Sequence, residues 1–167
     1  MDRHAPARNS LVNIGHVVLR YGELADAALW STPTLYVDEA ELALRDPDSG
    51  LHEESLEGPL LGINRTVMEL DALADLVESL PPEVPVLALL DGSLVLFGLA
   101  GQRFPDYVRR ELLDNGLLLA LARLRDQAQR RTLAVASYIS LPGSKEVVST
   151  LRLHACPYTP VDCDRHL

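Results

Sequence analysis

The sequence predicts an α/β fold, and three observations support this class. The unbroken apolar run Val86–Leu90 is typical of a strand covered on both faces near the centre of a sheet. A helical pattern over residues 64–80 precedes this run, and a second long helical pattern follows Pro105. Stretches rich in β-branched residues at Ser10–Tyr21 and Leu133–Ile139 favour further strands. Strands and helices therefore alternate along the chain.

The bulk composition is that of one ordinary globular domain over residues 1–167. Hydrophobic residues make up 47% and charged residues 23% of the chain, which argues against disorder. The net charge of −9 argues against non-specific nucleic-acid binding by the whole surface, although it leaves room for a local basic groove. Two cysteines, no export signal and no apolar run of membrane-spanning length predict a cytoplasmic protein without a membrane partner.

The N-terminal third is expected to contain a hairpin and a long loop. Ser10–Tyr21 reads as a strand, and Thr34–Val37 reads as its hairpin partner. Residues 38–59 are acidic and rich in turn-forming residues, with the clearest loop signal at Asp46–Gly50.

The helix predicted over residues 64–80 carries the first candidate functional residue. Asn64 is a plausible N-cap and Pro81 a stop signal. Helical spacing groups three acidic residues on the solvent face: Asp71, Asp75 and Glu78. Glu69 points the opposite way, towards the apolar side of the helix, where a lone carboxylate is costly unless it is paired or binds a cation. Alternatively, Glu69 reaches the rim near the helix start, where the helix dipole favours it.

The second candidate is Asp91, which follows the predicted strand Val84–Leu90. At the end of a buried strand it would occupy the edge where open α/β sheets bind ligands. Asp91-Gly92 is also a strong hairpin signal, which would join Val86–Leu90 to Ser93–Phe97. The two interpretations are compatible, because a carboxylate can bind a metal from a turn.

The C-terminal half is expected to hold a long helix, a strand and a short helix. The long helix opens at Pro105 and runs towards Arg130, with Asn115-Gly116 as a possible break or kink. Its buried side is predicted to consist of leucines: Leu112, Leu113, Leu117, Leu118, Leu121 and Leu124. Leu133–Ile139 reads as a strand and Ser144–Leu153 as a short helix capped by Ser144.

Two further groups of residues leave alternatives open. Arginines gather around the long helix, either as a solvated face with local acid partners or as phosphate-positioning groups: Arg103, Arg109, Arg110, Arg123, Arg125, Arg130 and Arg131. Four side chains near the C-terminus have spacings that would suit zinc, although incidental thiols are the commoner outcome: His154, Cys156, Cys163 and His166.

Four segments, taken in order, resemble the NurA family of DNA-repair nucleases. Asp2–His4 with Leu11–Gly15 resembles the stretch after the family's first Asp-Gly-Ser motif, and Arg65–Glu69 resembles its Arg-x-x-Met-Glu helix. Leu90–Leu94 resembles its second Asp-Gly motif, and Tyr138–Val148 resembles its Tyr-x-Ser-x-Pro segment with the helix that follows. Each motif alone is weak, but their order over nearly the whole chain is fairly specific.

The resemblance implies a ribonuclease-H-like mixed sheet with flanking helices and a nuclease dependent on Mn²⁺ (or Mg²⁺). It implies that Glu69 and Asp91 are catalytic metal ligands, and that the protein processes DNA double-strand ends as a homodimer beside a HerA-type helicase-translocase. The family's first aspartate and its C-terminal histidine region have no counterpart here, so we expect a domain truncated at both ends that is weakly active or inactive alone. The alternatives are a non-catalytic partner-binding domain using Leu112–Leu124 and a zinc-stabilised structural module.

Overall fold

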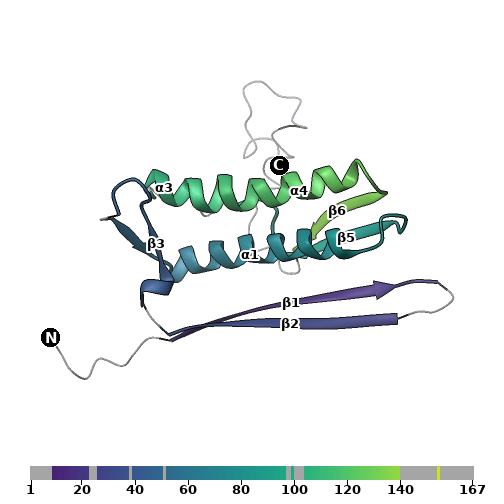
Figure 1. The fold of residues 1–167 in the computed structure, drawn as a ribbon, viewed down its shortest axis with the longest axis horizontal. Coiled ribbons are helices and arrows are strands. Elements are labelled where there is room, and N and C mark those ends of the chain that lie inside the picture. The colour runs from purple at the N-terminus through teal and green to yellow at the C-terminus, as the bar shows by residue number, and fades with distance from the viewer. Residues whose placement is uncertain are drawn as a thin grey trace, which may run out of the picture.

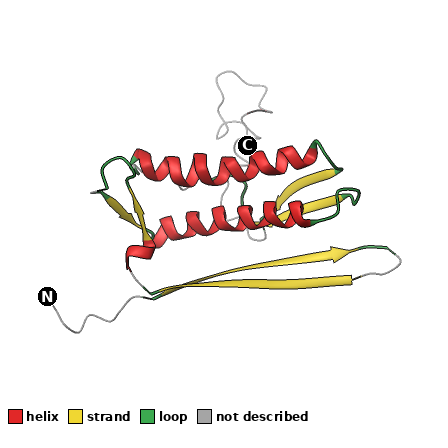
Figure 2. Cartoon of the chain, viewed as in Figure 1, coloured by secondary structure: helices red, strands yellow, loops and turns green. Residues whose placement is uncertain are grey.

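The described residues form a mixed α/β fold, which confirms the predicted class (Figures 1 and 2). In the computed structural model the described strands form three separate two-stranded sheets. A long helix, α1, lies between the β1–β2 hairpin and a second long helix that runs from α3 to α4 (Figure 1). None of the described helices combines the length and apolar character that crossing a membrane needs. The structure describes residues 9–22, 26–37, 39–50, 52–96, 99, 104–139 and 154.

The first sheet is a long antiparallel hairpin of β1 (Ser10–Arg20) and β2 (Asp26–Tyr36). The predicted first strand is confirmed, and the predicted Thr34–Val37 partner is the end of a longer strand. The earlier part of β2 lacks an alternating pattern, so its pairing with β1 rather than local preference makes it a strand. Pro33 is tolerated there because β2 is paired on one side only among the described strands.

One face of this hairpin packs on α1 and the other does not. Side chains alternate across a strand, so Val12 and Ile14 point the same way, and they are buried with 6% and 7% exposure. On the same face His16 stacks on Trp30, with the ring centroids 5.3 Å apart.

A small hairpin lies within residues 38–59, which the sequence predicts as an acidic, turn-rich loop. The 3-10 helix η1 (Glu39–Leu42) leads into β3 (Ala43–Arg45), which pairs antiparallel with β4 (Glu53–Ser55). The predicted Asp46–Gly50 turn is confirmed, because the Gly50 N–H donates to the carbonyl oxygen of Asp46 at 2.8 Å.

Helix α1 spans Gly58–Ser79 and therefore begins before the predicted range of 64–80. Pro59 lies in its first turn, where the missing N–H costs no helical bond. The predicted N-cap role of Asn64 is wrong, because Asn64 lies inside the helix. The end before Pro81 is confirmed, since the residue after Ser79 is already extended.

Strands β5 (Val86–Asp91) and β6 (Leu133–Tyr138) pair in parallel, so the Asp-Gly hairpin is not formed. Residues 93–96 form no strand, and Phe97 lies outside the described residues. The expectation that β5 is covered on both faces is wrong. Ala88 and Leu90 are buried against the helices, whereas Leu87 and Leu89 are 63% and 57% exposed.

The predicted long helix after Pro105 is confirmed as three continuous segments: α3 (Asp106–Arg109), η2 (Arg110–Leu118) and α4 (Leu119–Ala128). η2 is a π-helix, so the predicted irregularity at Asn115-Gly116 takes the form of wider turns. A Cβ atom on Gly116 would lie 2.6 Å from Val67 Cγ1, so glycine allows this helix to approach α1 closely. The helix predicted at Ser144–Leu153 lies outside the described residues.

The predicted leucine stripe is confirmed in part. Leu112, Leu117 and Leu124 are buried, and Leu113 and Leu121 pack partly buried against the core. Leu118 is 47% exposed, which contradicts its predicted burial. The physical reason is the π-helical stretch, whose i→i+5 bonds shift the phase of the helix ahead of α4.

The interior consists of two apolar clusters. The first joins α1, β5, η2 and α4, and its buried members are Leu70, Ala74, Val77, Ala88, Leu90, Leu117, Ala120 and Leu124. The second joins the β3–β4 region, the start of α1 and the α3 end of the second helix, and its buried members are Leu42, Leu56, Leu60, Ile63, Leu99, Val108 and Leu112. Val67 packs partly buried against both clusters, so it lies where they meet.

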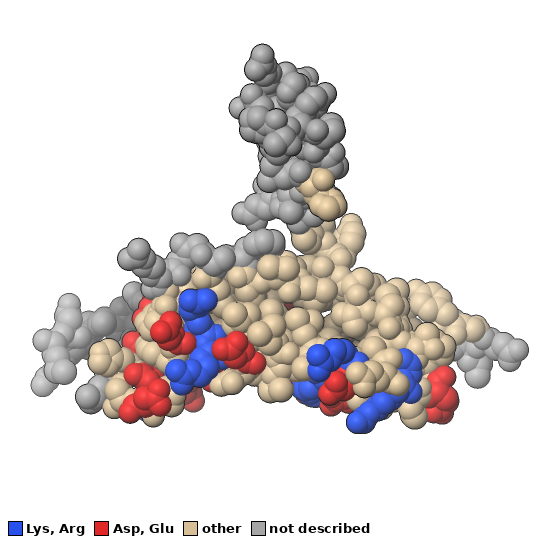
Figure 3. Space-filling model, turned by 90° about the horizontal axis from the view of Figure 1, so that it is seen from above, with Lys and Arg blue, Asp and Glu red and all other residues tan. Residues whose placement is uncertain are grey.

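Arg123 of α4 forms ion pairs with acidic residues of α1 on the surface of the protein, and so links the two long helices. Its guanidinium donates to Asp71 at 2.6 Å and to Glu78 at 2.7 Å, and it also bonds Asp75. The three acids are exposed, so their predicted solvent face is confirmed. Seen from above, charged side chains gather in two groups, one towards the α3 end and one towards the α4 end (Figure 3).

Candidate functional site

Glu69 lies in the interior of α1, well away from the helix start. The alternative in which the N-terminal dipole stabilises Glu69 is therefore wrong, because the helix begins at Gly58. Its side chain is 28% exposed, and Arg65 Nε lies 3.3 Å from Glu69 Oε1, one helical turn earlier. Glu69 is thus a half-buried carboxylate with one exposed counter-charge.

The charge of a second carboxylate, Asp91, contributes to the electrostatic surroundings of Glu69. Burial is the largest effect on its pKa and raises it; the Arg65 guanidinium opposes this rise, and the negative charge of Asp91 adds to it. The charge on Asp91 therefore reaches Glu69, although the two residues lie on different elements. Two like charges held in this way are relieved when a proton or a cation lies between them.

Asp91 is the last residue of β5 and its side chain is exposed. It lies opposite Tyr138 in the parallel register, and the Gly92 N–H continues the ladder by donating to the Tyr138 carbonyl oxygen at 2.9 Å. Gly92 has a φ of 133°, a backbone conformation that favours glycine, so the chain turns away directly after Asp91. This is the carboxyl end of a parallel pair, where open α/β sheets bind ligands.

Chemically, Glu69 and Asp91 offer oxygen ligands, which hard divalent cations prefer. Within the described part of the chain, no group of three or more His, Cys, Asp or Glu side chains has the arrangement of a metal site. The two carboxylates would therefore supply only part of a coordination shell, with water at the remaining positions, as is common for Mg²⁺.

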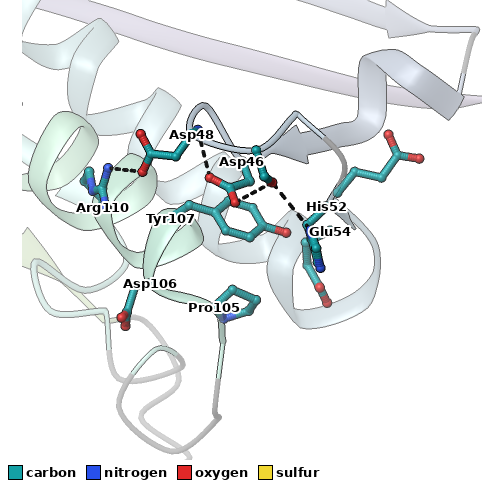
Figure 4. Close-up of a pocket in the computed structure, with 10 residues that line it drawn as sticks. Asp46, Asp48, His52, Glu54, Pro105, Asp106, Tyr107 and Arg110 are labelled. Atoms are coloured by element: carbon teal, nitrogen blue, oxygen red, sulfur yellow. Dashed lines mark hydrogen bonds and ion pairs between the residues drawn. The ribbon is translucent and has the colours of Figure 1, made fainter.

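A second acidic region, which we call the Asp46 pocket, was not predicted (Figure 4). This cavity of about 660 Å³ lies between the β3–β4 hairpin and α3, where Tyr107 and Pro105 face the acidic turn. Its remaining lining residues are mostly acidic or polar: Asp46, Asp48, Ser49, His52, Glu53, Glu54, Asp106 and Arg110. The Asp-Pro-Asp-Ser-Gly sequence signals a turn, and nothing local indicates that α3 packs across it.

Three of the five carboxylates that line the Asp46 pocket, those of Asp46, Asp48 and Glu53, have hydrogen-bond or ion-pair partners. Asp46 accepts from the Ser49 hydroxyl at 2.7 Å and from the Asp48 N–H at 3.0 Å, and these bonds lower its pKa. Arg110 lies 3.5 Å from Asp48. The pKa of Tyr107 is raised, first by burial and then by the surrounding negative charge, to which Glu54 contributes most. This region is thus acidic but largely satisfied internally.

Two arginines of the long helix pair with acids of other elements: Arg123 binds the acids of α1, and Arg110 binds Asp48. Arg125 pairs with Asp126 of the same helix, and Arg131, which follows the helix, donates to the carbonyl oxygen of Leu80 at 3.0 Å. Among the described ion pairs, none joins an arginine of this helix to Glu69 or Asp91. Arg103 lies outside the described residues.

The candidate zinc ligands cannot be placed together. His154 is exposed, whereas Cys156, Cys163 and His166 lie outside the described residues. Comparisons with protein-family models, curated proteins and solved structures find no match to this chain.

Proposed function

We propose that this protein is a divalent-metal-dependent DNA nuclease and that Glu69 and Asp91 hold its cation. The observation that carries the proposal is that the half-buried carboxylate of Glu69 has its pKa raised first by burial and further by the charge of Asp91, which ends a parallel strand. A cation between them would relieve both the burial cost of Glu69 and its repulsion by Asp91. Two of the four NurA-like segments, Arg65–Glu69 and Leu90–Leu94, contain these two residues.

Phosphodiester hydrolysis explains why these two carboxylates would be useful. A hard cation lowers the pKa of bound water to produce a nucleophile, and it stabilises the charge that develops on the phosphate oxygens. Nucleases of the two-metal type place their cations roughly 3.5–4 Å apart, which requires shared carboxylate ligands. We propose Mn²⁺ or Mg²⁺, a ribonuclease-H-like arrangement of the complete site, and a HerA-type translocase and a second copy as partners.

In the metal-free protein, Arg65 supplies the positive charge that partly neutralises Glu69. Its side chain is 60% exposed, and its ion pair within the described residues is to Glu69. An exposed ion pair of this kind contributes little to stability, so replacing it costs little. If Glu69 held a cation, Arg65 would no longer be needed as its counter-charge, and its guanidinium would be suited to bind a phosphate.

A cleavage assay tests the proposal. The purified protein is incubated with labelled single- and double-stranded DNA, with Mn²⁺ or with EDTA. We expect Mn²⁺-dependent cleavage that Glu69→Gln or Asp91→Asn lowers by roughly 10–100-fold or more, because each removes a positioned ligand. Asp46→Asn is the matched control and should cleave as the wild type does. Cleavage that survives both ligand substitutions, or none at any protein concentration, would contradict the proposal.

A non-catalytic, partner-binding role is the second candidate. The observation that favours it is exposed apolar surface on the long helix, where Leu118 and Leu119 are 47% and 55% exposed. Metal-independent association that Leu119→Lys abolishes, without Mn²⁺-dependent cleavage, would favour this role.

A further inference from the structure

Strands β5 and β6 have one face that is largely exposed, and Asp91 lies at its end. We call it the outer β5–β6 face, and it consists of six residues: Leu87, Leu89, Asp91, Ala134, Ala136 and Tyr138. The residues that alternate with them, such as Ala88 and Val135, pack in the first apolar cluster instead. Asp91 is the one charged residue among the six, so uncharged surface extends up to the proposed cation ligand.

Tyr138 lies directly opposite Asp91 on this face. The two residues are partners in the parallel register, and neighbouring strands lie about 4.8 Å apart. The bond from the Gly92 N–H to the Tyr138 carbonyl oxygen, at 2.9 Å, holds the two strand ends together at this point. Side chains of register partners stand on the same face of a sheet, so the Tyr138 side chain starts beside the Asp91 carboxylate.

The Tyr138 ring is accessible to a flat ligand. Tyr138 is 65% exposed, and the ring contact found among the described residues joins His16 to Trp30 instead. The preceding residue of β6 on the outer face is Ala136, whose short side chain leaves room next to the ring. A tyrosine has only two side-chain torsions, so it loses little conformational entropy when a ligand packs on it.

A nucleotide fits both of these neighbouring side chains. Its phosphate oxygens are suited to a cation held by Asp91, and its base offers a flat face to an aromatic ring. One sugar separates the two groups, so a single nucleotide can reach both register partners. Within a duplex, each base is already paired and stacked between its neighbours. Only an unpaired nucleotide can therefore turn a face of its base towards Tyr138.

We propose that Tyr138 is a positioning residue that stacks on an unpaired nucleobase and thereby holds the phosphate of that strand at Asp91. The inference rests on the proposed nuclease site, to which it adds a residue that grips the strand beside the cation. Aromatic stacking accepts every base, because every base has a π face. Tyr138 therefore favours an unpaired strand over a duplex and does not select a sequence.

Binding of a strand that resists cleavage tests the stacking directly. A single-stranded oligonucleotide with phosphorothioate linkages and one 2-aminopurine, whose fluorescence falls on stacking, is titrated with the full 167-residue chain in Mn²⁺. Wild type and Tyr138→Phe, which keeps the ring, should quench the fluorescence equally. Tyr138→Leu should abolish the quenching and weaken binding by about 5–150-fold. Tyr21→Leu is the matched control, because Tyr21 is a 90% exposed tyrosine that follows β1, and it should bind as the wild type does.

An abasic nucleotide makes the matching change on the strand. Placed at the position where 2-aminopurine is quenched most, it should weaken binding to the wild type. It should leave the affinity of Tyr138→Leu unchanged, because the stacking pair is already lost in that variant. A blunt-ended duplex should bind wild type and Tyr138→Leu with equal affinity. Circular dichroism checks that each variant is folded, and Tyr138→Phe provides the test that changes the side chain least.

Cleavage kinetics separate this inference from the nuclease proposal. With an unmodified single strand and Mn²⁺, Tyr138→Leu should raise KM and leave kcat close to that of the wild type, whereas Glu69→Gln should lower kcat. Mn²⁺-dependent cleavage with an unchanged KM in Tyr138→Leu would overturn the stacking and leave the nuclease proposal standing. Quenching that depends on Tyr138 without any cleavage would support the stacking and contradict the nuclease. Equal single-strand affinity of wild type and Tyr138→Leu, or no binding of single strands by the wild type, would also overturn the stacking.

Discussion

The Glu69–Asp91 site and the Asp46 pocket are both acidic, yet their carboxylates are in opposite situations. The Asp46 pocket has five carboxylates. Hydroxyl, N–H and guanidinium groups bind three of them, Asp46, Asp48 and Glu53, and the pKa of Asp46 is lowered. Glu69 and Asp91 are only two, yet burial and mutual repulsion raise the pKa of Glu69. On the proposed assignment, the cation binds where burial and a neighbouring charge disfavour the ionised carboxylate, and not where acidic groups are most numerous.

The Glu69–Asp91 site and the Asp46 pocket lie next to different apolar clusters of the interior. Leu70, which follows Glu69 in α1, is fully buried in the first cluster together with Leu90 of β5. Val108, which follows Tyr107 in α3, is fully buried in the second cluster. Each acidic region can therefore be perturbed separately through the apolar residue behind it.

The largest effect on stability is expected from Leu70→Ala. Removing a fully buried leucine leaves a cavity, and the free energy of unfolding should fall by about 2–5 kcal/mol. Because α1 and β5 meet at this residue, Mn²⁺ affinity should fall as well. Val108→Ala is the matched control, since it opens a cavity in the second cluster and should leave Mn²⁺ affinity unchanged. Urea denaturation and Mn²⁺ titration measure the two quantities; equal Mn²⁺ affinity in both variants would show that the two regions are not supported separately.

Gly116→Ala tests the close packing of η2 against Val67 of α1, the residue that contacts both apolar clusters. Helix propensity alone favours alanine by about 1 kcal/mol. The new Cβ would lie 2.6 Å from Val67 Cγ1, so we instead expect a loss of about 1–3 kcal/mol in the free energy of unfolding.

The control is the double variant Gly116→Ala with Val67→Ala, which removes the clash. The second substitution should cost less in the Gly116→Ala background than in the wild type. Additive costs of the two substitutions, measured by urea denaturation, would contradict the close approach of the helices.

The smallest expected effect is the pH dependence of stability in the metal-free protein. The lowered pKa of Asp46 contributes stability above its ordinary pKa near 3.8, and this contribution is lost as the pH falls through the lowered value. Glu69 has the opposite sign: its raised pKa means that the folded state binds the proton more tightly, so stability is gained as the pH falls through that value. At neutral pH, Asp46→Asn should therefore lower Tm slightly and Glu69→Gln should raise it.

Thermal scans from pH 3 to pH 8 measure both trends. The Tm difference between each variant and the wild type should shrink towards the acid end, as the carboxyl groups become protonated, and it should shrink at lower pH for Asp46→Asn than for Glu69→Gln. A fall in Tm for Glu69→Gln at neutral pH would indicate that the Arg65 ion pair outweighs the burial of Glu69.

Local patterns predicted the elements that carry the candidate site. The apolar run before Asp91 and the β-branched run at Leu133–Ile139 identified two strands, and their parallel pairing fits the position of Asp91 at the strand end. The start of α1 was mispredicted because Asn64 is a good N-cap residue in isolation, whereas Pro59 and the apolar residues after it extend the helix.

Features that depend on distant parts of the chain could not be predicted. Burial of β5 on one face only, and exposure of Leu118, follow from how the helices pack and from the π turns of η2. The Asp46 pocket forms because α3 lies across a turn far from it in sequence, and no local pattern records that contact.

Paramagnetic NMR with Mn²⁺ compares the two acidic regions most directly. In the ¹⁵N-labelled protein, substoichiometric Mn²⁺ should broaden the amide signals of Arg65, Glu69 and Gly92 first and leave those of Asp48 and Tyr107 sharp. The broadening should disappear in the Glu69→Gln, Asp91→Asn double variant and persist in Asp46→Asn. Broadening centred on the Asp46–Gly50 turn, or broadening at Glu69 that survives the double variant, would contradict the assignment of the cation to Glu69 and Asp91.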